Sequence, residues 1–401
     1  MKSYTDPETQ KVYHSPVIPK FVGITVTACL ITALTACLLT LLFVRKNFSK
    51  YTRLEELDAY IQKNYYLDLN DEDQEKMMDY MLKGYVAGLG DKYSQYLTPE
   101  EYNEFLTKES GKTVGIGVTV IQGEDGYPEI LEVQENSPAQ TAGLQVGDVI
   151  TAVDGIDILE AGYTESIANI KGEEHSSVMI TILRENSTEN YEVIRETFDV
   201  ATAKGEMLAD QIGYIRITNF RENTVEQFLS ALEELKNAGA KGFIFDVRDN
   251  GGGLLNSLEK MVDPLLPEGV IATATYHGGR TETVVKSDPE ELNLPMVVLV
   301  NGNSASAAEL FSASLRDFKQ AKLVGTQTYG KGVMQVTART DDGGGLSLTV
   351  ATYQTSRSEC YQGVGLEPDV IVELPESFTI GLSDREDDIQ LATAIELLKN
   401  N

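Results

Sequence analysis

Hydrophobic and polar positions change their spacing several times along the 401-residue chain, and each change predicts a different structure. An uninterrupted apolar stretch covers residues 21–44. From residue 48 to residue 106, apolar side chains recur every third or fourth position, as on an amphipathic helix. Residues 111–196 instead hold short β-branched runs separated by glycines, which are typical of strands. From Met207 onward strands alternate with helical patterns, which predicts an α+β multidomain protein.

The expected domain boundaries follow these changes of pattern. They are an N-terminal tail at 1–20, a transmembrane helix at 21–44, a helical N-terminal region at 48–108, a β-rich module at 111–196, an α/β core at 200–375 and a C-terminal helical segment at 376–401. The tail is polar, contains three prolines and is expected to be flexible. The apolar stripes of the helical region fit either packing within the domain or a homodimer interface.

The apolar segment 21–44 carries no charge and is bounded by Lys20 and Arg45. At ~1.5 Å per residue, such a helix can cross a hydrocarbon layer of ~30 Å. A cleaved signal peptide usually has a shorter apolar region. Cys29 and Cys37 each end a lipobox-like tetrapeptide, but lipidation of Cys37 would leave an apolar run at the new N-terminus. A single-pass membrane anchor is therefore favoured over a lipoprotein.

The charges beside this segment do not support an extracytoplasmic body by the positive-inside rule. The basic residues on its C-terminal side are Arg45, Lys46, Lys50 and Arg53, against Lys2, Lys11 and Lys20 before it. Large domains nevertheless translocate largely regardless of such charges. The prediction is a protein of the cell membrane whose body is extracytoplasmic.

Composition narrows the possible partners and cofactors. The formal net charge of −29 argues against nucleic acid, because phosphate binding needs clustered Lys and Arg. The sequence has only three cysteines and three histidines, and no cluster of them predicts a metal site. Cys360 is the single thiol outside the apolar segment, so no disulfide can form within the body. We expect no metal and no cofactor.

The stretch VVLVNGNSASAA at residues 297–308 is the strongest candidate for a nucleophile. Its β-branched run, Asn-Gly-Asn turn and small residues predict a buried strand, a tight turn and a helix start. Unpaired N–H groups at a helix start favour a developing negative charge. From these residues alone, Ser304 and Ser306 are both possible nucleophiles.

A serine nucleophile needs a base, and the histidines fit poorly. His175 lies in the β-rich module and His277 precedes the candidate strand, and no GxSxG elbow is present. A lysine with a depressed pKa can accept the proton instead, because burial disfavours the ammonium. Lys331, in the sequence TYGKG, is a suitable candidate, although a lysine in such a loop is more often solvated.

A glycine run, Gly251-Gly252-Gly253, follows a predicted buried strand. It lacks the Gly-Lys-Ser/Thr of a nucleotide-binding P-loop, and glycines alone are weak evidence for one. The alternative is a close approach of backbone N–H groups to a substrate.

The β-rich module resembles a PDZ domain. The stretch SPAQTAGLQVGDVI is close to the signature of that family, and the carboxylate-binding loop corresponds to Gly115, Ile116, Gly117 and Val118. PDZ domains bind an extended chain end by strand addition, with loop N–H groups on the terminal carboxylate. The resemblance therefore implies polypeptide partners recognised through their C-terminus.

From Asp91 to about Leu397 the chain resembles the C-terminal processing peptidase family of PDZ-containing serine proteases. The motifs that carry the resemblance occur in the family's order: DKYSQYLTPEEY, the PDZ stretch, IGYIRITNF, DVRDNGGGLL, NGNSASAAEL, TQTYGKGVMQ, GVGLEPDV and DIQLATAIELL. The resemblance implies membrane-anchored or secreted proteases whose α/β core is crotonase-like.

The same resemblance assigns site residues. The nucleophile falls on Ser306, the general base on Lys331, and a supporting glutamine, one helical turn later, on Gln335. The oxyanion hole would be formed by the backbone N–H groups of Gly252 and Ala307. A further family aspartate falls on Asp317, for which structural support is expected.

The chain departs from the family pattern at three positions. Gly251 stands where the family usually has proline, Ala308 where it has serine, and Lys171 where it often has an arginine linked to PDZ–protease communication. Two other functions remain as alternatives: a catalytically silent PDZ scaffold at the membrane, and a crotonase-type acyl-CoA enzyme, for which no adenine-binding signal is present.

Overall fold

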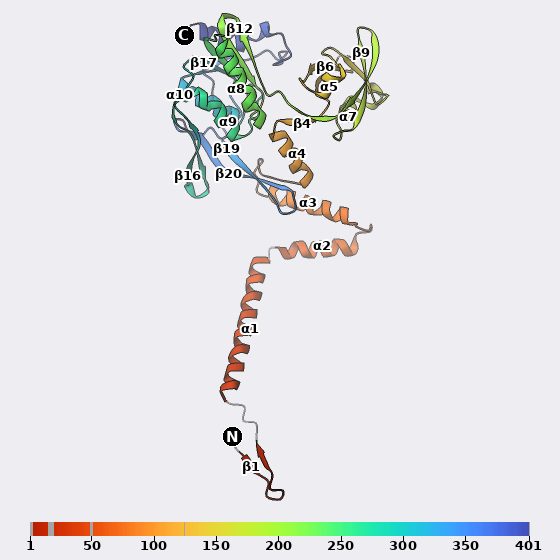
Figure 1. The fold of residues 1–401 in the computed structure, drawn as a ribbon, viewed down its shortest axis with the longest axis vertical. Coiled ribbons are helices and arrows are strands. Elements are labelled where there is room, and N and C mark those ends of the chain that lie inside the picture. Colours follow the sequence, from red (N-terminus) through yellow and green to blue (C-terminus); the bar gives the residue numbers. More distant parts are fainter. Residues whose placement is uncertain (1–2, 15–19, 49–50, 124, 401) are drawn as a thin grey trace. The chain divides into compact units, whose positions relative to one another are not determined.

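The computed structural model describes residues 3–14, 20–48, 51–123 and 125–400 (Figure 1). By its internal contacts the chain divides into two compact units, Met1–Tyr80 and Met81–Asn401.

The first unit begins with a small hairpin in which β1 (Ser3–Thr5) pairs antiparallel with β2 (Val12–His14). The sequence pattern did not predict this hairpin within the N-terminal tail. The carboxylate of Asp6 accounts for the turn, because it accepts hydrogen bonds from a backbone N–H and a hydroxyl within it. Residues 1–2 and 15–19 of the predicted tail lie outside the described residues.

Helices make up the rest of the first unit. α1 (Lys20–Phe48) covers the predicted apolar segment, and its portion Gly23–Phe43 is long and apolar enough to cross a membrane. A signal sequence near an N-terminus passes the same test. α2 (Thr52–Asn64) follows, and α3 (Asp71–Ala87) begins in this unit and ends in the next, directly before Gly88.

The second unit contains a β-rich module with a hydrophobic core of its own. Before it lies α4 (Pro99–Glu109), which is capped by Thr98. The strand order in the module is β10-β9-β7-β6-β5, with β8 paired to β7. The elements are β5 (Val118–Gln122), β6 (Pro128–Val133), α5 (Pro138–Ala142), β7 (Val149–Val153), β8 (Ile156–Asp157), α6 (Ile158–Ala161), α7 (Tyr163–Ile170), β9 (Ser177–Arg184) and β10 (Ser187–Ile194).

A separate strand pair joins the module to the rest of the unit. β4 (Lys112–Gly115), which enters the module, pairs antiparallel with β11 (Glu196–Asp199), which leaves it.

The core of the second unit is a six-stranded sheet of order β12-β13-β14-β17-β18-β21. β12 is antiparallel to β13 and the other pairs are parallel, so the predicted alternation of strands with crossover helices is confirmed. The strands are β12 (Ala203–Leu208), β13 (Ile212–Ile217), β14 (Gly242–Asp246), β17 (Met296–Val300), β18 (Lys322–Gly325) and β21 (Val370–Ile371). The helices are α8 (Glu222–Asn237), α9 (Leu255–Val262), α10 (Ala307–Lys319) and α11 (Ile389–Lys399).

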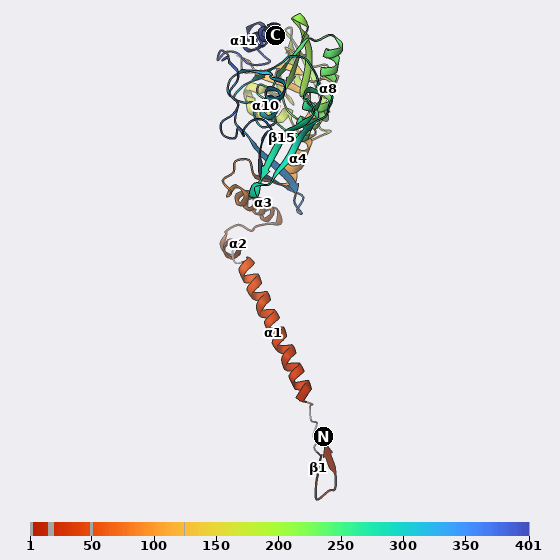
Figure 2. The same cartoon turned by 90° about the vertical axis from the view of Figure 1, so that its left-hand side faces the viewer.

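The two central strands, β14 and β17, are buried at every position, which explains their nearly continuous apolar sequences GFIFD and MVVLV. Because side chains alternate along a strand, Phe243 and Phe245 of β14 pack with α8, α9 and α10, whereas Ile244 packs with α11. The C-terminal helix thus covers the face opposite to the helix that follows the candidate serine (Figure 2).

A second sheet of the core has the order β16-β15-β20-β19, with β3 paired to β20. Its strands are β15 (Gly269–Tyr276), β16 (Thr281–Ser287), β19 (Val333–Arg339), β20 (Gly345–Thr355) and β3 (Gln95–Leu97). β3 interrupts the region that was predicted to be helical throughout. Its pairing brings the segment around Tyr93 to the edge where Lys331 precedes β19.

Candidate active site

The turn between β17 and α10 distinguishes the two candidate serines. Ser304 is fully buried, and its hydroxyl donates to the carbonyl of Val247 (2.7 Å) and accepts from the N–H of Asn301 (3.0 Å). Ser306 is only partly buried and faces a cavity. Its backbone has φ 56° and ψ −117°, an unfavourable region for a residue with a side chain. The Ser304 hydroxyl therefore stabilises the turn through its two hydrogen bonds, while Ser306 faces the cavity.

The glycine run lies directly against this turn, as its small residues led us to expect. Gly252 has φ +101°, and a Cβ there would come within 2.7 Å of Ser306 Cβ and 2.9 Å of the backbone N of Ala307. The N–H of Ala305 donates to the carbonyl of Asn250 (2.9 Å) and ties the two turns together. Only glycine permits this approach.

The two expected oxyanion donors differ in their present partners. Ala307 is the first residue of α10, so its N–H has no acceptor within the helix. The N–H of Gly252 instead donates to Asn250 Oδ1 at 2.8 Å. Ala307 is thus ready to receive a negative oxygen, whereas Gly252 would have to exchange its bond to Asn250 for one to substrate.

Lys331 lies on the loop before β19, with its Nζ 4.7 Å from the ring centroid of Tyr93. Burial lowers the pKa of Lys331 below its ordinary value. The nearby Tyr329 and Asp91 oppose that shift, and the positive charge of Lys92 adds to it. Lys331 is therefore not the solvated loop lysine that such a sequence usually contains.

A cavity of about 500 Å³ joins these groups. The residues that line it include Ser306, Ala307, Lys331, Gln335, Gly251, Gly253, Tyr93 and Tyr353. Leu254, Leu255, Phe105 and Met334 supply apolar walls. The candidate nucleophile, the candidate base and the glycine turn are far apart in the sequence, but they face one space large enough for part of a peptide.

Glu309 is a site residue that the sequence reasoning missed. Its side chain is fully buried and accepts four hydrogen bonds, from Ser306 N (2.9 Å), Lys331 N (2.8 Å), Gly330 N (2.7 Å) and Thr328 Oγ1 (2.6 Å). One carboxylate therefore holds the main chain of both the nucleophile and the base. The capping-box pattern Ser306-Ala-Ala-Glu309 was the signal that could have identified it.

Of the two supporting residues expected from the resemblance, Gln335 lines the cavity beside Ser306, whereas Asp317 is bonded to Thr355. Gln335 is on β19, so its expected place one helical turn after Lys331 is wrong. It lines the cavity, and its amide donates to Thr349 Oγ1 (2.9 Å). Asp317 is near the C-terminal end of α10, where its carboxylate accepts from Thr355 Oγ1 (2.5 Å). It ties α10 to β20, which is a structural role.

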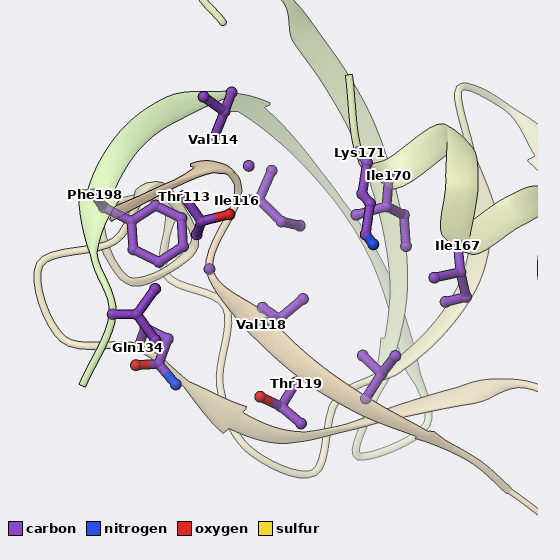
Figure 3. A pocket seen from close by; sticks show the side chains of 14 residues that line it. Thr113, Val114, Ile116, Val118, Thr119, Gln134, Ile167, Ile170, Lys171 and Phe198 are labelled. Atoms are coloured by element: carbon purple, nitrogen blue, oxygen red, sulfur yellow. The ribbon is translucent and has the colours of Figure 1, made fainter. Parts of the chain in front are cut away.

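The PDZ-like module has a groove of about 260 Å³. Figure 3 shows Val118 and the helix residues Ile167 and Ile170 around it, with Lys171 at the end of α7. The loop Gly115–Val118 forms one end of the groove, as expected from the PDZ resemblance. The loop's shape is fixed where the carbonyls of Ile116 and Gly117 accept from Ala139 N and Gln134 N.

Among the described residues, no group of three or more His, Cys, Asp or Glu side chains could hold a metal ion.

Comparisons with known proteins agree with this geometry. The model of a family described as peptidase family S41 matches residues 211–372, and a PDZ domain model matches residues 129–184. The carboxy-terminal processing protease CtpA of Bacillus subtilis is 33% identical over 361 residues, which cover 86% of this chain and 76% of that protein. A carboxyl-terminal-processing protease of Synechocystis is 31% identical over 320 residues, which cover 78% of this chain and 75% of that one.

The fold is shared with a solved structure. A putative S41 protease from Bacteroides fragilis superposes with a TM-score of 0.56 at 18% identity, covering 86% of this chain and 96% of that one. With relatives above 30% identity that span most of both chains, this protein belongs to the C-terminal processing peptidase family, the PDZ-containing serine peptidases of family S41.

Proposed function

We propose that this protein is a membrane-anchored serine endopeptidase that uses Ser306 as nucleophile and Lys331 as general base, with access regulated by its PDZ domain. The observation that carries the proposal is the carboxylate of Glu309, which holds the main chains of Ser306 and Lys331 beside one cavity.

The chemistry follows from the positions of these groups. Burial lowers the pKa of Lys331, which favours its neutral amine, and this amine accepts the proton of Ser306 as Oγ attacks the scissile carbonyl carbon. The N–H of Ala307, joined by that of Gly252 once it leaves Asn250, stabilises the tetrahedral oxyanion. The ammonium of Lys331 then protonates the leaving amine, and water hydrolyses the ester on Ser306. Gln335 borders the cavity and would orient the substrate or the lysine.

Cleavage of an unfolded protein by the full chain in detergent tests this function. We expect wild type to cleave it and Ser306→Ala to leave it intact. Normal cleavage by Ser306→Ala would exclude Ser306 as the nucleophile, and an inert wild type under all conditions would favour the silent scaffold. The crotonase-type enzyme requires acyl-CoA turnover, which we expect to be absent. A crotonase-like arrangement of the core remains part of the proposal, supported by its parallel strands and crossover helices.

The positive charge of Lys92 near Lys331 predicts that the variant Lys92→Met has a shifted pH profile of activity. Lys92 Nζ lies 4.9 Å from the ring centroid of Tyr93, which also contacts Lys331, and its charge lowers the pKa of Lys331. The rate should rise with pH as Lys331 loses its proton. Without Lys92 the pKa of Lys331 rises, so the ascending limb moves to higher pH and activity at neutral pH falls by roughly twofold.

The pH profile of kcat/KM measures this shift. Lys236→Met, which removes an exposed charge on α8, is the control and should leave the profile unchanged. An ascending limb that stays in place or moves to lower pH in Lys92→Met would contradict the assigned electrostatics.

The PDZ groove is proposed to bind the C-terminal end of a polypeptide substrate. Apolar Val118, Ile167 and Ile170 suit an apolar terminal side chain, and Lys171 is placed to attract the carboxylate (Figure 3). We expect a peptide with a free carboxylate to bind about tenfold more tightly than its amide.

The variant Gly117→Ala tests the groove directly. Gly117 has φ +85°, and a Cβ there would lie 2.2 Å from Ser137 Cβ, so the loop must distort. Calorimetry should show weak peptide binding that no longer depends on the carboxylate. Gly155→Ala is the matched control, because Gly155 has φ +80° in the same domain but open space around it. Equal peptide affinity in wild type and Gly117→Ala would argue against this groove.

Three broader parts of the proposal rest on sequence and packing. α1 would anchor the protein in the cell membrane with its body extracytoplasmic, supported by the length and apolarity of Gly23–Phe43. The stripes of residues 48–108 would serve a homodimer. The domain boundaries at 111–196, 200–375 and 376–401 are supported by the separate hydrophobic core of the PDZ module.

A further inference from the structure

A buried tyrosine touches the nucleophile. Tyr353 lies on β20 with 4% of its surface exposed, and its hydroxyl oxygen is 3.2 Å from Ser306 Oγ. The same hydroxyl is 3.0 Å from the backbone carbonyl of Lys331, so its single proton is donated to one of these two oxygens at a time. The backbone N–H of Tyr353 also donates to the carbonyl of Gly332 at 3.0 Å. Tyr353 is thus bound to the lysine loop by both main chain and side chain.

We propose that Tyr353 is a third catalytic residue. It orients the Ser306 hydroxyl and holds it at a fixed position relative to the loop that carries Lys331. This inference rests on the proposed Ser306/Lys331 reaction. A serine side chain has three staggered rotamers about its Cα–Cβ bond, and only some of them direct Oγ to a substrate carbonyl. A hydrogen bond from a fixed, buried partner favours one of them.

The environment of Tyr353 suits this role and not that of a base. Burial raises the pKa of Tyr353 above its ordinary value, so the phenol stays protonated while Lys331 titrates. The ring is held by an edge-on contact with Tyr361, at 6.0 Å between centroids. Glu309 and Cys360 are the other titratable groups near it. The proton of Ser306 must therefore still pass to Lys331, and Tyr353 fixes only the starting geometry.

The variant Tyr353→Phe removes the hydroxyl and keeps the ring. We expect kcat to fall about tenfold, the factor that one hydrogen bond of ordinary net strength represents, while KM stays within about twofold. Inactivation by a small fluorophosphonate should slow by a similar factor, because that reagent reports on Ser306 without peptide binding. The ascending limb of the pH profile should stay in place, since the base is unchanged.

Tyr361→Phe is the matched control. Tyr361 is buried beside Tyr353, and its hydroxyl makes no hydrogen bond to Ser306 or Lys331. Removing that hydroxyl should leave kcat and the inactivation rate unchanged. Thermal melting of both variants separates an effect on the site from loss of the fold.

Three outcomes decide between the possibilities. Wild-type kcat and inactivation rate in a folded Tyr353→Phe would overturn the inference, as would equal losses in the two tyrosine variants. If Ser306→Ala cleaves normally in the same assays, the proposed function itself has failed. If Ser306→Ala is inactive while Tyr353→Phe resembles wild type, the failure belongs to Tyr353 alone.

Discussion

Replacing Lys331 by Met should lower kcat/KM about 10⁴-fold, because the Tyr353 hydroxyl beside Ser306 Oγ stays protonated and cannot replace the lysine as base. Loss of a general base in serine proteases has effects of this order, since the remaining donors and substrate binding supply only part of the rate enhancement. The methionine side chain is of similar length, and the backbone N–H at this position still reaches Glu309. The loss should therefore appear in kcat rather than in stability.

Lys331→Arg separates proton transfer from simple charge. A guanidinium keeps the positive charge but stays protonated in proteins, so it cannot act as a base. Steady-state cleavage of a peptide by the full chain should find this variant as inactive as Lys331→Met. Substantial activity in Lys331→Arg would mean that the lysine acts through its charge and that the base lies elsewhere.

Arg248→Met should destabilise the core by about 3–5 kcal/mol, the second large effect that we expect. Arg248 is 1% exposed and lies between the carboxylates of Asp246, also fully buried, and Asp388. Its guanidinium makes two hydrogen bonds to each of them, at 2.6–3.0 Å. Removing it leaves the Asp388 carboxylate without this partner and Asp246 with only the more distant Arg216, at 3.6 Å. Asp388 caps α11, so the C-terminal helix is affected as well.

The loss in free energy of unfolding caused by Arg248→Met should depend on pH. Burial alone would raise the pKa of Asp246, but the hydrogen bonds and charge of Arg248 hold it below its ordinary value. In wild type this contributes stability above the unfolded pKa, which is lost as pH falls through the lower folded pKa. Without Arg248 the carboxylate of Asp246 takes up a proton at higher pH. The deficit should therefore be largest near neutral pH and shrink in acid.

Urea unfolding at several pH values measures both effects. Arg280→Met is the matched control, because Arg280 pairs with Glu282 on the surface, where an ion pair contributes about 1 kcal/mol or less. A deficit in Arg248→Met no larger than in the control, or one that grows in acid, would contradict the buried network.

The strand, turn and helix start around Ser306 could be predicted because each depends on residues that are adjacent in the sequence. An apolar run before Asn301 gives a buried strand, and small residues after it give a helix start. The choice between Ser304 and Ser306 could not be made this way, since both are small hydroxyl residues of one turn. It depends on where each hydroxyl finds a partner, and the Ser304 hydroxyl donates to the carbonyl of Val247, directly after the neighbouring strand β14.

Contacts between distant segments account for what the sequence did not reveal. Tyr353 and Tyr93 reach the site because β20 pairs with β19 and β3, which no local pattern specifies. The short strand β3 owes its conformation to that pairing. Glu309 looked like an ordinary first-turn acid of a helix, and only the fold brings Gly330 and Lys331 to its carboxylate.

The most direct test of the dyad is to find which atom reacts. A fluorophosphonate bonds to an activated serine oxygen with loss of fluoride, and mass spectrometry of the digested full chain locates the adduct. We predict a single adduct on Ser306 in wild type, a rate of formation that rises with pH, and almost none in Lys331→Met. An adduct on Ser304, or an unchanged labelling rate in Lys331→Met, would contradict a Ser306/Lys331 dyad.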